Sequence, residues 1–316
     1  MSNMLRLHIT YESKSSDGPE SLIAKFPPTD AAVHSRGLEL GFFEGESGFY
    51  SQLANSTATT TPRCYFAQFD ASTGRFLILL EDLSAARLGD VTFGCTDSEA
   101  ASGIETLAHL HASWWESDSL DDYGWLRRFE DRQEIIVGLL PEAFPTFTSR
   151  FRDKLESDQF ELLRELSLRA NGLPAVRFSG PRTLLHGDFK LDNLFFRPSG
   201  EMVVCDWGLV MAGPAMFDVA SFLSLNLAME LRRHVDLDLI RRYVATLEAE
   251  GVRDYGFHAA LADYRLQLVA FLPRLIGAGG LAEFADEHAL EEYALGLRRV
   301  ISAVNDSGGI DDLLQT

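Results

Sequence analysis

Two short segments in the second half of the chain decide its fold: HGDFKLDN at residues 186–193 and DWG at residues 206–208. The second segment follows the apolar run MVVC, which predicts a short buried strand before it. Together they supply Asp188, Asn193 and Asp206 from two loops. Phosphoryl transfer requires an aspartate that orients the attacking hydroxyl, and hard oxygen ligands for one or two Mg²⁺ ions. These three side chains therefore predict a phosphotransferase site.

The spacing of these residues strengthens that prediction. In protein kinases the catalytic aspartate is followed five positions later by a metal-binding asparagine, and a D-F-G aspartate comes after a strand. Asp188 and Asn193 have that spacing, and Asp206 follows 13 residues after Asn193. H-G-D-x-x-x-x-N followed by D-W-G resembles the aminoglycoside phosphotransferase and choline kinase-like superfamily. The two motifs are specific because they occur together and in this order.

Other segments resemble one branch of that superfamily, the ecdysteroid-kinase-like (CHK kinase-like) proteins. They are AKFPP at 24–28, FYSQLA at 49–54, TPRCYFA at 61–67, LLEDL at 79–83 and LAHLHASWW at 107–115. The resemblance implies an α+β, bilobal, protein-kinase-like fold. We expect a small β-rich nucleotide-binding lobe at residues 1–83 and a larger helical lobe, catalytic and acceptor-binding, at residues 84–316.

The resemblance assigns roles to the residues that match its motifs. Asp188 matches the catalytic base, and Asn193 and Asp206 match the Mg²⁺ ligands. His186 matches the histidine that braces the catalytic loop. Lys190 stands where protein kinases often place a lysine near the transferred phosphoryl group. Two further matches are structural: Gly208 is expected to permit a turn that other residues resist, and Asp218 to support the catalytic loop.

The small lobe is expected to hold the nucleotide. Lys25, at the end of SLIAKF, matches the lysine that contacts the phosphates. A kinase lysine needs a helix glutamate to hold it, and Glu46 in ESGFY fits best, with Glu44 as the alternative. The segment LLEDL resembles the hinge between lobes, where the backbone of Glu81, Asp82 and Leu83 would bind adenine. Leu80 or Leu83 would flank the ring.

Periodicity gives a coarse layout that agrees with this fold. Leu5, Leu7, Ile9 and Tyr11 alternate as in a half-buried strand, and SLIAKF at 21–26 completes a hairpin. Segments 63–70 and 75–83 predict a second hairpin, and 42–54 predicts a helix between the two. Helical spacing recurs at 99–115, 148–170, 227–250, 258–276 and 285–304, with Asn171-Gly172 and Pro174 as a stop signal after the second. Residues 305–316 predict a last turn and a frayed end.

The front of the chain departs from the family pattern. In the ecdysteroid-kinase-like branch a glycine-bearing segment precedes the stretch that resembles LRLHITYES. Either the true start therefore lies upstream, or the small lobe is shortened and lacks its first strand and its Gly-rich, phosphate-covering turn. In the second case the phosphates would lose a roof of backbone N–H groups. Loss of such donors costs on the order of 10²-fold in rate by analogy with oxyanion sites.

Composition limits the partners and the location. The 316 residues carry 47 acidic and 28 basic side chains, a formal charge of −19. This charge opposes a general nucleic-acid or anionic-membrane surface. No apolar run has the roughly 18 to 20 residues of a membrane span, and the N-terminus lacks a secretory h-region. Three scattered cysteines, without CxxC spacing, make a disulfide framework and a structural zinc site improbable. We expect a cytoplasmic protein, and the sequence leaves its oligomeric state open.

These observations predict a kinase that uses ATP and Mg²⁺ to phosphorylate a hydroxyl of a small molecule. Protein kinase activity is disfavoured, because no A-P-E motif occurs and Asp218 follows Asp206 by 12 positions, too few for a long activation loop. A catalytically impaired, kinase-like binding protein is the main alternative. A hydrolase lacks supporting motifs. Selectivity for the acceptor is assigned to helices within 227–304. An apolar alcohol suits the branch resemblance, whereas a cationic aminoglycoside or choline-like acceptor suits the charge.

Overall fold

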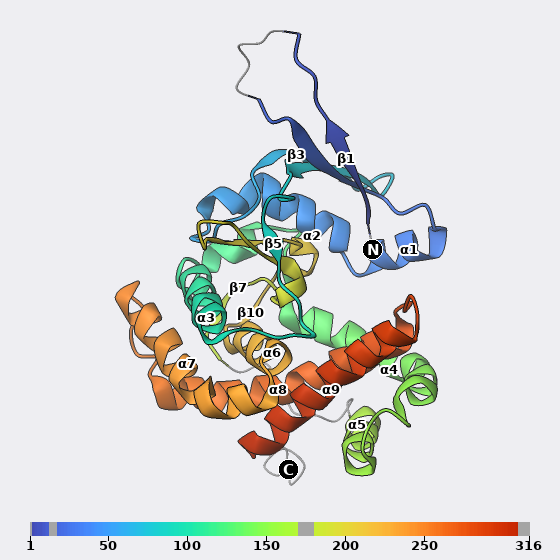
Figure 1. Ribbon diagram of the computed structural model, residues 1–316, viewed down its shortest axis with the longest axis vertical. Helices are drawn as coiled ribbons and strands as arrows, with labels where there is room; N and C mark the ends of the chain where they lie inside the picture. The colour runs from blue at the N-terminus through green and yellow to red at the C-terminus, as the bar shows by residue number, and fades with distance from the viewer. Residues whose placement is uncertain (1, 13–17, 170–179, 309–316) are drawn as a thin grey trace.

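A computed structural model describes residues 2–12, 18–169 and 180–308 (Figure 1). The first 83 residues form a four-stranded antiparallel sheet with helices against one face. Its strands are β1 (Asn3–His8), β2 (Ser21–Phe26), β3 (Cys64–Asp70) and β4 (Arg75–Glu81), in the order β1-β2-β4-β3. Both predicted hairpins are therefore present, and the central strands β2 and β4 pair with each other.

Strand β1 differs from its prediction. The alternation of Leu5 and Leu7 predicted a half-buried strand, but the side chains of these residues are 56% and 39% exposed, and Met4 is 64% exposed. The exposure of these side chains follows from the position of β1 in the sheet. Among the described strands β1 pairs with β2 alone, so it is the edge of the sheet, and no element covers both of its faces. Part of the connection between β1 and β2 lies outside the described residues.

The helical segment predicted at 42–54 is present, in three parts. Helix α2 (Phe42–Gly48) continues as a π-helical turn at Phe49–Leu53 and a short 3-10 turn at Ala54–Ser56. Helix α1 (Ala31–Glu39), which the sequence analysis did not predict, precedes it and is capped by Asp30. The ring of Phe49 stacks on that of Trp207, with centroids 3.7 Å apart. This contact ties the α2 segment to the DWG motif.

The rest of the chain is mainly helical (Figure 1). Its helices are α3 (Asp97–Ala112), α4 (Phe129–Phe151), α5 (Ser157–Arg169), α6 (Met216–Asn226), α7 (Met229–Ala249), α8 (Phe257–Leu281) and α9 (Glu287–Ser307). Two small sheets lie among them, β5 (Arg87–Leu88) with β8 (Leu194–Phe196) and β9 (Met202–Val204), and β6 (Arg127–Arg128) with β10 (Met211–Pro214) and β7 (Arg182–Leu185). The architecture is α+β, as predicted.

The small sheets hold the two motifs. HGDFKLDN connects β7 to β8, and DWG directly follows Cys205 at the end of β9. Strands β8 and β9 pair antiparallel, from Leu194 opposite Val204 to Phe196 opposite Met202. Because this pairing brings the end of the first loop to the start of the second, the two motifs lie side by side.

One helix prediction needs correction. The predicted helix at 148–170 is the end of α4 and all of α5, separated by a break after Phe151. Most of α4 was missed because Pro141 and Pro145 lie inside it, and proline normally ends a helical pattern. The proposed stop at Asn171-Gly172 and Pro174 lies outside the described residues, as do residues 309–316 of the predicted end.

Two negative findings apply to the described part of the chain. None of its helices is long and apolar enough to cross a membrane. Its three cysteines, Cys64, Cys95 and Cys205, are free thiols.

Candidate active site

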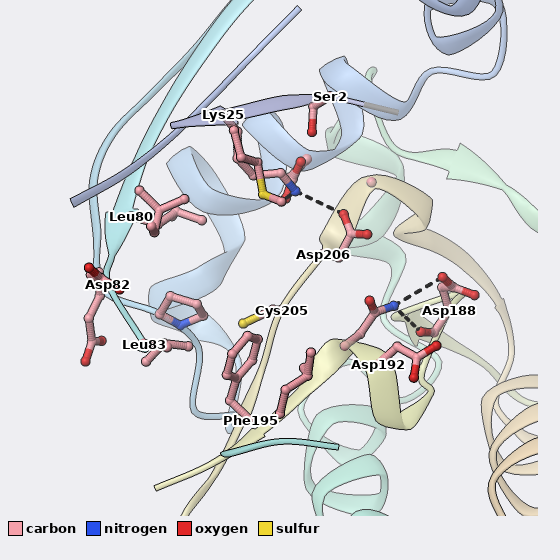
Figure 2. Close-up of a pocket in the computed structure, with 18 of the residues that line it drawn as sticks. Ser2, Lys25, Leu80, Asp82, Leu83, Asp188, Asp192, Phe195, Cys205 and Asp206 are labelled. Atoms are coloured by element: carbon pink, nitrogen blue, oxygen red, sulfur yellow. Dashed lines mark hydrogen bonds and ion pairs between the residues drawn. The ribbon is translucent and has the colours of Figure 1, made fainter. Parts of the chain in front are cut away.

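A cavity of about 630 Å³ is lined by both the N-terminal sheet and the two motif loops (Figure 2). One end is polar, with Lys25 and Asp206 facing each other and Asp188 beyond them. The other end is apolar. Its walls include Ile23, Leu80, Leu83, Leu88 and Phe195. A cleft with this division suits a ligand that has a flat apolar group and a charged tail.

Lys25 is the cation at the polar end. Its ammonium lies 2.5 Å from Glu46 Oε1 and 3.0 Å from Asp206 Oδ1. Burial opposes the charge on Lys25, but Glu46 and Asp206 outweigh it, so the pKa of Lys25 is raised and the side chain stays protonated. Glu46 lies on the buried face of α2, whereas Glu44 is partly exposed and makes no ion pair with Lys25 among the described contacts. The geometry thus selects Glu46 from the two alternatives.

The predicted hinge residues line the apolar end, but their side chains face other protein groups. Glu81 makes an ion pair with Arg197 at 2.8 Å and accepts a hydrogen bond from the Arg63 N–H. Asp82 accepts from the Ser21 hydroxyl at 2.7 Å and contacts Arg6 at 2.8 Å. Leu83 contributes apolar surface to the cavity. Glu81 and Asp82 therefore hold the hinge in place through their side chains.

Asp188 is held by three donors. Its Oδ1 accepts from Arg274 Nη2 at 2.6 Å, and its Oδ2 lies 3.1 Å from Lys190 Nζ and accepts from Asn193 Nδ2 at 3.1 Å. A carboxylate has about four lone-pair sites. One site on Oδ1 therefore stays open for a further hydrogen-bond donor.

The charge of Asp188 is fixed by these neighbours. Burial alone would raise its pKa, but the charges of Lys190 and Arg274 outweigh burial and hold the pKa well below its usual range. In turn, Asp188 raises the pKa of Lys190. The aspartate is thus ionised at neutral pH. Lys190 contacts Asp188 and is not among the described residues that line the cleft.

His186 braces the loop and is fully buried. Its Nδ1 accepts from the Asp188 N–H at 3.1 Å, so its Nε2 carries the proton and donates to the Cys205 carbonyl at 2.9 Å. Burial lowers the pKa of His186, which favours this neutral tautomer. Asp218 accepts from the N–H groups of His186 and Gly187, at 2.7 and 3.0 Å. His186 thus joins the first motif loop to the chain just before the second, and Asp218 ties the first loop to α6.

Backbone conformation corrects one prediction. The turn at DWG was assigned to Gly208, but the left-handed residue is Asp206, with φ of 64°. A Cβ on Gly208 would meet only ordinary contacts, the nearest at 3.5 Å. Gly187 is the glycine that its position requires, because its φ is 79° and a Cβ there would lie 2.2 Å from the Leu209 carbonyl oxygen. Unusual φ at a non-glycine residue is typical of functional sites.

Asn193 and Asp206 suit a hard divalent cation. The Asn193 amide donates through Nδ2 to the Asp188 carbonyl at 2.8 Å, which leaves its Oδ1 as a possible ligand. The Asp206 side chain is 54% exposed, and its Oδ2 has no partner among the described contacts. An amide oxygen and a carboxylate are ligands that Mg²⁺ accepts together with water and phosphate oxygens. No group of three or more His, Cys, Asp or Glu side chains suited to a metal occurs in the described part of the chain.

Two residues that contribute to the site, Arg274 and Phe195, were missed by sequence reasoning. Arg274 lies 86 positions after Asp188, on α8, and no local pattern marks it as a partner of that residue. Phe195 lies in β8, and its ring lines the apolar end (Figure 2). Its place two residues after Asn193 is the one signal that could have suggested this role.

Comparison with known proteins identifies the class. The fold resembles a choline kinase from Cryptosporidium parvum, with a TM-score of 0.61 and 12% identity over 100% of this chain and 90% of the other. It also resembles an aminoglycoside 2'-phosphotransferase-IIIa solved with GDP, with a TM-score of 0.54 and 15% identity over 90% and 87% of the two chains. The fold is therefore that of the kinase-like phosphotransferases.

Sequence comparison gives the family. The pattern of the phosphotransferase enzyme family matches residues 10–261, and the chain belongs to that family. Curated relatives include the probable acyl-CoA dehydrogenase IBR3 of Arabidopsis thaliana, 34% identical over 37% of this chain, and human acyl-CoA dehydrogenase family member 11, 29% identical over 38%. The chain matches about one seventh of the length of each, 14% in both cases.

Proposed function

We propose that the protein is a kinase that transfers the γ-phosphoryl group of ATP to a hydroxyl of a small molecule with the help of Mg²⁺. One observation carries this proposal. Lys25, Asp188, Asn193 and Asp206 converge at one end of a cleft whose other end is apolar. Membership of the phosphotransferase family supports the reaction class, and the acceptor and the nucleotide are the parts that we propose.

The nucleotide would span the cleft, with its base at the apolar end and its phosphates at the polar end. The adenine ring would lie between Leu80, Leu83 and Phe195, against the backbone of the hinge. The triphosphate would extend to Lys25, and Glu46 would hold the ammonium group of Lys25 in position. An aminoglycoside phosphotransferase of similar fold was solved with GDP, which supports a nucleotide as the ligand.

Asn193 and Asp206 would hold the metal. Mg²⁺ bound there would neutralise charge that develops on the phosphates. Lys25 would then exchange its contact with Asp206 for the phosphate oxygens, because Asp206 is more exposed than Glu46 and is the partner that can turn away.

The open lone pair on Asp188 Oδ1 accepts the hydrogen bond of the acceptor hydroxyl. The hydroxyl oxygen forms a bond to the γ-phosphorus, and the bond to the β,γ-bridging oxygen breaks with its electron pair going to ADP. The hydroxyl proton passes to Asp188 and then to solvent. Because the pKa of Asp188 is low, its main contribution is to orient the hydroxyl, which suits the loose transition state of phosphoryl transfer.

A turnover assay tests this function. We expect consumption of ATP with Mg²⁺ when a panel of hydroxylated compounds is added, and loss of that consumption in Asp188→Ala. GTP in place of ATP tests the choice of nucleotide. If neither protein turns over either nucleotide while both still bind it, the protein is a kinase-like binding scaffold. The ecdysteroid-kinase-like assignment and the cytoplasmic location stay predictions.

A further inference from the structure

A second cavity, of about 240 Å³, lies behind the catalytic loop. Helices α4 and α8 supply most of its wall, with the DWG loop on the opposite side. Its surface is mainly apolar, formed by Leu40, Phe42, Phe129, Ile136, Leu139, Met211, Phe217 and Leu281. The volume is below the range of about 300–1,000 Å³ that is typical of sites for drug-sized ligands. The cavity therefore suits a compact apolar group.

This cavity adjoins the nucleotide cleft at the catalytic aspartate. Phe42 and Leu209 line both cavities. Arg274 lines the second cavity, while its guanidinium donates to Asp188 Oδ1 in the first and to the Gly187 carbonyl. Arg274 therefore links the second cavity to Asp188, which lines the first.

Arg132 is the unusual residue of this cavity. It is 4% exposed, and its Nε and Nη1 have no hydrogen-bond partner among the residues that the structure describes. No carboxylate of the described residues lies within 4.0 Å of its guanidinium, and none of the described residues that line the cavity is acidic. Its one ring contact is with Phe42, whose centroid is 5.9 Å from Cζ. A buried arginine without an anion is unfavourable, because burial removes the water that solvates the guanidinium and no other partner replaces that water.

A second orphan group lies next to Arg132 in the same cavity. Gln133 is also 4% exposed, and its Nε2 donates to the Ala270 carbonyl while its Oε1 has no partner in the described part of the chain. Two adjacent side chains of α4 that line this mainly apolar cavity thus have unsatisfied polar atoms. Polar groups at such depth normally have partners, so a ligand with its own polar groups explains them.

We propose that this cavity binds the acceptor and that the acceptor is an anionic alcohol, a hydroxycarboxylate whose carboxylate pairs with Arg132 and whose hydroxyl reaches Asp188. The proposal rests on the proposed kinase function, since the hydroxyl is the group that is phosphorylated. A short apolar chain would join the carboxylate to the hydroxyl and pack against the apolar walls of the cavity. Arginine is the residue best suited to a carboxylate, because its planar fork donates two parallel hydrogen bonds.

The electrostatics agree with this choice and disagree with a cationic acceptor. Burial lowers the pKa of Arg132, and the charges of Arg274 and Arg127 lower it further. An anion would oppose the effect of these charges, whereas an ammonium would add a further positive charge to a cavity that Arg36, Arg132 and Arg274 already line. The net charge of −19 is that of the whole chain and does not describe the charge around this cavity. The expectation of a choline-like or aminoglycoside acceptor, which relied on net charge, is therefore not our proposal.

Matched acceptor series test the proposal. We would measure ATP-dependent phosphorylation and, separately, calorimetric binding without nucleotide. The probes are a homologous series of ω-hydroxycarboxylates, the corresponding hydroxyamides and the corresponding amino alcohols. We expect the hydroxycarboxylate of best-fitting length to bind more tightly and to have the higher kcat/KM, by on the order of ten- to a hundredfold over its amide.

Three variants locate the effect at Arg132. Arg132→Met should remove the preference for carboxylate over amide, and its fold is expected to survive because replacing an unpaired buried charge with an apolar chain is often neutral or stabilising. Arg132→Lys should restore part of the preference. Arg128→Met is the matched control, since Arg128 is an exposed residue that pairs with Asp121 just before α4. Thermal unfolding checks that each variant is folded.

The two measurements separate this proposal from the kinase function. Turnover of neutral or cationic alcohols, with no preference for carboxylates and no effect of Arg132→Met, would overturn the acceptor while the kinase function stands. Arg132-dependent binding of hydroxycarboxylates without phosphorylation of any compound would support the anion site and contradict the kinase function. If no member of the series binds or reacts in an Arg132-dependent way, the proposal is wrong.

Discussion

Asp188 shows how the site controls one carboxylate. Its three donors come from Lys190 and Asn193 in its own loop and from Arg274 in a distant helix. The sequence motif singles out Lys190 and Asn193, but for contacts with the phosphoryl group and the metal, not with Asp188. The third requires the tertiary fold. The cations keep Asp188 ionised, and one lone pair stays available to a hydroxyl.

Removing the distant cation should change the pH dependence of activity. Because Arg274 lowers the pKa of Asp188, Arg274→Met should raise that pKa, and the aspartate should become protonated at a higher pH. The acidic limb of the kcat/KM profile should therefore move to higher pH, and the maximum value of kcat/KM should fall. Arg265→Met, an exposed position on the same helix, serves as the control. An acidic limb that stays in place would show that Arg274 does not set the charge of Asp188.

Gly187 gives a prediction about stability. An alanine there meets a positive φ of 79° and a contact of 2.2 Å with a backbone oxygen. Gly200 has a similar φ of 89°, but a Cβ there would have nothing within 4 Å. We expect Gly200→Ala to lower the free energy of unfolding by about 1 kcal/mol and Gly187→Ala to lower it by more, as measured by urea unfolding. Equal losses would mean that the loop adjusts without cost.

At the scale of elements, helix α2 places Glu46 against the strand that carries Lys25. Glu46→Gln should therefore leave Lys25 paired mainly with Asp206, the residue needed for the metal. We expect kcat/KM for ATP to fall on the order of ten- to a hundredfold, the worth of a hydrogen bond to a charged group. Glu44→Gln, two residues away on the same helix, should have little effect. Similar losses in both variants would contradict the assignment of Glu46.

The elements that the sequence predicted well are those with strong local patterns. The two hairpins and helices α3, α7, α8 and α9 have clear periodicity, and the motifs placed the catalytic loop between two short strands. Helix α4 was hidden by its internal prolines, Pro141 and Pro145. It carries Arg132, so the acceptor cavity could not be anticipated. Lys25 and Glu46 were paired from motif resemblance, and the contact between them depends on how α2 packs on the sheet.

At the scale of the molecule, the cleft joins the N-terminal sheet to the helical region. A ligand that contacts both parts should stabilise the native state, by about 2.7 kcal/mol at a concentration 100 times its Kd. We expect ATP with Mg²⁺ to raise the midpoint of thermal unfolding more than ATP alone. In Asp206→Asn the additional effect of Mg²⁺ should be lost. A Mg²⁺ effect of unchanged size in that variant would place the metal elsewhere.

The most direct test of the account is a single-turnover experiment with excess enzyme, Mg²⁺ and ATP labelled in the γ-phosphoryl group, in the presence of the acceptor that turns over best. The account predicts that label appears in an organic phosphate ester, and that Asp188→Asn, which keeps the size of the side chain, slows this transfer by about 10²- to 10⁴-fold. Transfer at an equal rate in both proteins would contradict it.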